Sequence, residues 1–97
     1  MYVRVVRFTD VAPERMEALK ATIDESEGPP EGVDSVALKV LVDKSQRTAV
    51  VLQYFPTAEA MEEGARVFAA MDPSDTPGTR ASVDMCELRI DREMTAG

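Results

Sequence analysis

Residues 2–8 read Tyr-Val-Arg-Val-Val-Arg-Phe, and residues 48–55 read Thr-Ala-Val-Val-Leu-Gln-Tyr-Phe. Both runs are rich in β-branched and aromatic residues, which favour β-strands. A helical pattern follows each run. Pro13 suits the first turn of one helix, and Thr57 is a good N-cap for the other. The two halves of the chain are therefore alike, which predicts two units that each pair strands around a helix.

Two further strand-like runs, at residues 33–43 and 82–91, complete the pattern, with a hairpin-like link at residues 44–47. The second helix is expected to run to about residue 71, and residues 72–79 have the composition of a surface loop. The order βαββαβ predicts an α+β, ferredoxin-like fold, in which a four-stranded antiparallel sheet carries two helices on one face. We assign residues 1–92 to a single domain and residues 93–97 to a tail.

The composition excludes several classes of function. The formal net charge is −7, which argues against nucleic acid and against an anionic membrane surface as partners. The chain has no His and one Cys, so it lacks the usual residues for a zinc site or a His-activated nucleophile. We therefore expect no metal and no cofactor. No signal-peptide pattern or membrane-spanning apolar run is present, and we expect a cytoplasmic protein.

Alternation along the strands sorts their residues onto two faces of the sheet. We expect an almost purely aliphatic set to pack under the helices, namely Val3, Val5, Val36, Leu38, Val40, Val42, Val50, Leu52, Cys86, Leu88 and Ile90. The opposite face is too apolar for contact with water, so we expect it to form a homodimer and to line a pocket for a small hydrophobic ligand. The residues expected there are Tyr2, Arg4, Val6, Phe8, Lys39, Leu41, Gln53, Phe55, Met85 and Glu87.

The polar side chains of this face leave two interpretations open. Buried unpaired charges are costly. Ion pairs within the dimer, such as Glu87 with Arg4 or Lys39, would satisfy them. In the other interpretation, cationic side chains orient an anionic or enolate-like ligand, which makes Arg4, Lys39 and Arg89 the candidate catalytic residues.

The chain resembles the dimeric α/β-barrel superfamily, near the antibiotic-biosynthesis monooxygenase-like domains, over about residues 1–92. The opening strand, the helix that begins at Pro13, and the strand leading into Thr57-Ala58-Glu59-Ala60-Met61 carry this resemblance. It implies that two sheets face each other in a barrel. It also implies a cofactor-independent oxygenase, isomerase or cyclase acting on a hydrophobic, oxygenated ring compound. The alternative is a non-catalytic ligand-binding or structural dimer, and the sequence leaves open whether the protein is an enzyme.

Overall fold

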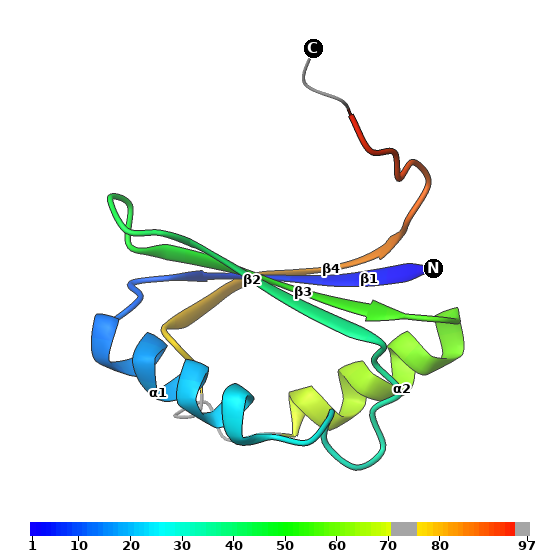
Figure 1. The fold of residues 1–97 in the computed structure, drawn as a ribbon, viewed down its shortest axis with the longest axis horizontal. Coiled ribbons are helices and arrows are strands. Elements are labelled where there is room, and N and C mark those ends of the chain that lie inside the picture. Colours follow the sequence, from blue (N-terminus) through cyan, green and yellow to red (C-terminus); the bar gives the residue numbers. More distant parts are fainter. Residues whose placement is uncertain (71–75, 95–97) are drawn as a thin grey trace.

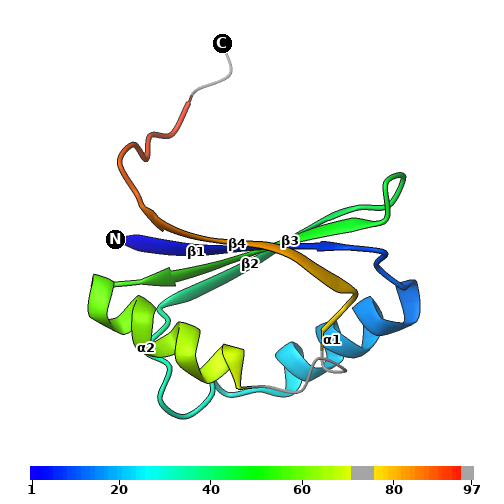
Figure 2. The same ribbon diagram turned by 180° about the vertical axis from the view of Figure 1, so that it is seen from behind.

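The computed structural model describes residues 1–70 and 76–94. Its elements are β1 (Tyr2–Thr9), α1 (Pro13–Glu25), β2 (Ala37–Asp43), β3 (Thr48–Phe55), α2 (Ala58–Ala69) and β4 (Thr79–Glu87). The four strands form one antiparallel sheet in the order β2-β3-β1-β4. Both helices lie on the same side of this sheet, as Figures 1 and 2 show from opposite directions. The predicted ferredoxin-like βαββαβ fold is therefore confirmed.

Several boundaries differ from the prediction. β2 begins at Ala37 rather than at residue 33, because Val33 is buried against Phe55 and Met61 instead of pairing in the sheet. β4 begins at Thr79, opposite Thr9, and ends at Glu87 rather than at residue 91. Residues 72–75 of the predicted loop lie outside the described part of the chain, and residues 76–78 form bends that lead into β4.

The two helices are held differently. Thr57 caps α2, since its side-chain oxygen accepts a hydrogen bond of 3.1 Å from the backbone N–H of Ala60. α2 buries Met61 and Gly64 against the sheet. α1 has no side-chain cap and buries none of its residues. The second helix is thus packed on the sheet, whereas the first stands off from it. No helix in the described residues is long and apolar enough to cross a membrane.

The predicted assignment of the faces is wrong for three of the four strands. Arg4 of β1 faces the helices, because its guanidinium lies over the ring of Phe68 on α2. Side chains directly opposite one another lie on the same face of the sheet. The residues of β3 and β4 that pair with Arg4, and every second residue from them, therefore share the face of Arg4. The residues of this set are Tyr2, Arg4, Val6, Phe8, Val51, Gln53 and Phe55, together with Val83, Met85 and Glu87 of the edge strand β4, which remain exposed. Those on the outer face are Val3, Val5, Val50, Leu52 and Cys86.

In β2 the prediction holds, since Leu38 and Val40 lie opposite Gln53 and Val51 on the helix side. The error arises because alternation divides residues into two sets without saying which set a helix covers. Both sets are apolar here. The helix side accepts Arg4 and Gln53 because their polar groups bond to each other.

The core is divided into two clusters at opposite ends of the sheet. One consists of Val6, Phe8, Val11 and Ala49. The other consists of Val33, Phe55 and Met61, with Val67 and Phe68 packed against it. Arg4 and Gln53 lie between the clusters along β1 and β3. Among the described residues, the apolar side chains of the two clusters consequently leave the middle of the helix side unfilled.

Candidate functional site

A cavity of ≈ 1120 Å³ occupies this unfilled region between the sheet and the helices. Small-molecule sites commonly have volumes of about 300–1,000 Å³, so the space is large enough for a ligand of several fused rings or a long chain. Its walls are mainly apolar and come from both helices and all four strands. Among them are Val6, Phe8, Leu19, Ile23, Val51 and Phe68.

The apolar stripe of α1 borders this cavity. Leu19 and Ile23 are four residues apart and so lie on one side of the helix, yet both are only half-buried. They line the cavity instead of contacting a filled core. The stripe therefore provides an apolar wall for whatever enters the space.

Arg4 and Gln53 supply the buried polar groups of the cavity. Arg4 is 4% exposed and Gln53 is 7% exposed, and they are the buried polar residues of the described chain. The Nη1 of Arg4 donates a 2.9 Å hydrogen bond to Oε1 of Gln53. The guanidinium carbon lies 5.1 Å from the centre of the Phe68 ring, within cation–π range. The Nε of Arg4 is buried and has no acceptor within the described residues.

Arg4 also lacks a carboxylate partner in the described part of the chain, where the ion pairs join Arg66 to Glu63 and Arg89 to Glu87. Burial lowers the pKa of the Arg4 guanidinium, and the positive charge of Arg80 lowers this pKa further. Both causes disfavour the cationic form. The site therefore holds the desolvated guanidinium of Arg4, and the positive charge of Arg80 lies close enough to act on it.

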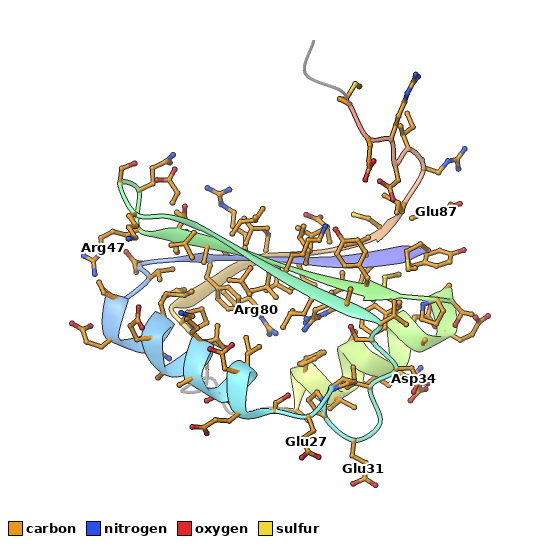
Figure 3. The ribbon with its side chains drawn as sticks, in the orientation of Figure 1. Glu27, Glu31, Asp34, Arg47, Arg80 and Glu87 are labelled. Carbon is orange, nitrogen blue, oxygen red and sulfur yellow. The ribbon has the colours of Figure 1, made fainter. Side chains whose placement is uncertain are left out.

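Arg80 reaches the cavity through a β-bulge in β4. Arg7 lies opposite Ser82, whereas the next residue, Phe8, lies opposite Arg80, so Ala81 is the extra residue of the bulge. In an unbroken register Arg80 would point to the outer face; the bulge turns it to the helix side. Figure 3 shows the Arg80 side chain between sheet and helices, where it lines the cavity.

One carboxylate-bearing residue, Glu27, is among the described cavity-lining residues. Its side chain points away from the sheet in Figure 3. It is also exposed. The interior of the cavity is thus cationic without a facing carboxylate from the described residues.

The predicted site residues are only partly brought together. Arg4, Val6, Phe8 and Gln53 line the cavity. Phe55 is fully buried in the cluster with Val33, and Tyr2 packs against that cluster. Met85 lies opposite Arg4 and Glu87 opposite Tyr2, but both are exposed and neither lines the cavity.

Lys39 and Leu41 lie elsewhere, on the outer face. The Nζ of Lys39 is 5.4 Å from the centre of the Tyr54 ring, and Leu41 is 55% exposed. Arg89 follows the end of β4 and lies 3.6 Å from Glu87. The suggested pairs of Glu87 with Arg4 or Lys39 are therefore not formed within one chain.

Sequence reasoning missed Arg80 and the contributions of α1. The face on which Arg80 lies depends on the bulge in β4, and no residue type in that segment indicates a bulge. For α1, the spacing of Leu19 and Ile23 identifies the apolar stripe, but it does not say whether the stripe meets a sheet or a cavity. Within the described residues, no group of three or more His, Cys, Asp and Glu side chains is placed to hold a metal ion.

Comparison with known proteins gives one structural match. No protein-family profile and no curated protein matches the sequence. Among solved structures, the chain matches MhuD, in a crystal structure of an arginine-to-serine mutant with two manganese protoporphyrin IX molecules bound per active site. The TM-score is 0.61 at 14% sequence identity, covering 97% of this chain and 100% of that chain. The two proteins thus share a fold, the ferredoxin-like architecture that the strand and helix pattern of this sequence predicts.

Proposed function

We propose that this protein binds a small, mainly apolar molecule in the cavity between its sheet and its helices. The observation that carries the proposal is the divided core, whose two clusters leave ≈ 1120 Å³ of apolar-walled space between them. Protein interiors are normally close-packed, and large unfilled spaces lose contacts that would stabilise the fold. A ligand with an apolar body would supply those contacts.

A metalloporphyrin of the kind bound by MhuD does not fit as a resident group. Porphyrin metals in proteins are held by His, Cys, Met or Tyr side chains. None of the described residues lining the cavity is of these types, and the chain has no His at all. The cavity therefore suits an organic ligand without a protein–metal bond.

Catalysis on a hydrophobic, oxygenated ring compound is the second candidate, and the buried guanidinium of Arg4 is the observation that favours it. A desolvated cation stabilises an enolate more strongly than a cation in water does. Lys39 and Arg89 are poorly placed for this role, since neither lines the cavity. Proton abstraction also needs a base, and Glu27 points away from the sheet. Binding is therefore the function that the described site supports best.

The neutral fluorescent probe N-phenyl-1-naphthylamine tests the binding proposal, because its emission rises in apolar surroundings. We expect the purified protein to bind it with saturable fluorescence. Val51→Trp places an indole in the cavity and should weaken binding at least about tenfold, which corresponds to roughly 1.4 kcal/mol. The matched control is Val50→Trp, one residue earlier on the same strand and on the outer face.

Circular dichroism of both variants checks that they fold. Binding that is lost in Val51→Trp and kept in Val50→Trp supports the cavity as the site. An absence of saturable binding to the wild-type protein, or equal loss in both variants, contradicts the proposal.

A further inference from the structure

We propose that the ligand of this cavity is an organic anion, an apolar molecule with one carboxylate-like group that binds to Arg4 and Gln53, with Arg80 as the second cation. This inference rests on the binding function proposed above and specifies the chemical class of the ligand. Arg4, Gln53 and Arg80 come from three different strands, and the fold places all three side chains around one apolar space.

Arg4 is a buried cation without a carboxylate partner among the described residues. A charged side chain that is 4% exposed normally has an ionic partner, because an isolated charge in an apolar site is costly. The described residues give Arg4 a neutral acceptor, Gln53, and an aromatic face, Phe68. Neither of these neutralises the charge. An anion is the missing partner.

The charges around the cavity also favour an anion. Arg80 is turned into the same cavity by the bulge and opposes the charge of Arg4. Two cations that repel each other both gain when one anion lies between or beside them. The carboxyl group of Glu27 points away from the sheet. Arg80 is exposed to solvent, so Arg4 is the cation that lacks compensation, and the compensating charge must come with the ligand.

The hydrogen-bond donors of Arg4 and Gln53 suit a carboxylate. The planar guanidinium presents five N–H groups, and Gln53 keeps its amide N–H donors when Oε1 accepts from Arg4. A carboxylate accepts such donors in a bidentate geometry, and charge-assisted bonds of this type are the stronger ones. The apolar walls then hold the remainder of the molecule.

Displacement of N-phenyl-1-naphthylamine tests the charge requirement separately from cavity binding. The two competitors are 2-naphthoate and its neutral isostere 2-naphthamide. We expect the carboxylate to displace the probe from the wild-type protein at a concentration at least about tenfold lower than the amide, the ratio that one charge-assisted hydrogen bond provides. Arg4→Met should bring this ratio, measured against the probe affinity of the variant itself, close to one.

Arg7→Met is the matched control. Arg7 lies on the same strand as Arg4, is exposed, and is absent from the lining of the cavity. This variant should keep the wild-type ratio. Arg80→Met replaces an exposed side chain, so it provides a second reading if Arg4→Met fails to fold, and it should lower the ratio at least about threefold.

Equal displacement by acid and amide from the wild-type protein, with the probe still bound, overturns the anion inference and leaves the binding function intact. A preference for naphthoate that persists in both Arg4→Met and Arg80→Met also overturns it. If the probe itself does not bind, the proposed function fails and the inference fails with it.

Discussion

At the scale of single residues, Gly64 decides how closely α2 approaches the sheet. A Cβ atom at this position would lie 2.8 Å from the ring of Phe55, which is fully buried and 0% exposed. The glycine costs helix stability, because Gly is about 1 kcal/mol less favourable than Ala in a helix. We infer that position 64 requires glycine because a larger residue would displace the Phe55 ring from its cluster with Val33 and Met61.

Gly64→Ala should therefore lower the free energy of unfolding in spite of the better helix former. Overpacking costs about 1–3 kcal/mol, so after the helix gain the net loss is up to about 2 kcal/mol. Urea unfolding followed by circular dichroism measures it. Gly28→Ala is the control, because a Cβ there meets nothing within 4 Å. An increase in the stability of Gly64→Ala would contradict this account of the packing.

At the scale of elements, the turn between β2 and β3 is organised by one carboxylate. Asp43 accepts hydrogen bonds from the hydroxyl and backbone N–H of Ser45 (2.7 and 3.1 Å) and from the backbone and side chain of Gln46 (3.2 and 2.9 Å). The side-chain bond from Ser45 is the main reason why the pKa of Asp43 is lowered, and the backbone bond from Gln46 adds to it.

The lowered pKa makes the contribution of Asp43 depend on pH. A carboxyl group whose folded pKa lies below its unfolded value, about 3.9, stabilises the fold above that value and loses the contribution as the pH falls through the folded pKa. Asp43→Ala should thus be less stable than wild type in urea at about pH 7. The difference should shrink towards about pH 2. Asp91→Ala, an exposed control, should show no such change, and a difference for Asp43→Ala that is constant with pH would refute the role of ionisation.

The elements also show where sequence reasoning succeeds and where it stops. The spacing of apolar residues, Pro13 and Thr57 predict the strands, the helices and their order, because these signals are local. The faces depend on non-local facts: the hairpin register places Val40 opposite Val51, and the bulge turns Arg80 to the helix side. The sequence identifies Arg4 and Gln53 as site candidates, while their burial and mutual hydrogen bond come from tertiary pairing.

At the scale of the whole molecule, the outer face of the sheet is covered by neither helix (Figures 1 and 2). It carries Val5, Leu41, Val50 and Leu52, of which Leu41 is 55% exposed. Burial of a leucine side chain contributes roughly 1.5–3 kcal/mol. The predicted homodimer therefore has an apolar surface available. Leu41 of β2 lies on it as predicted, whereas its residues from β1 and β3 are those that alternation assigned to the helix side.

Native mass spectrometry should give the mass of two chains for the wild-type protein, and Leu41→Lys should give the mass of one, because a charge would replace an apolar contact. Glu17→Lys, on the exposed side of α1, is the control and should keep the wild-type mass. A one-chain wild-type protein, or a Leu41→Lys variant that keeps two chains, would be evidence against association through this face.

The absence of buried residues in α1 has a consequence for how the molecule fluctuates. Segments with few buried apolar contacts open locally at low cost in free energy, so α1 is the part of the fold that detaches most easily. A ligand against Leu19 and Ile23 would hold this helix in place and act as the missing portion of the hydrophobic interior. The fraction of molecules in which α1 is held against the ligand would then rise with ligand concentration, because binding shifts the equilibrium towards the ordered form.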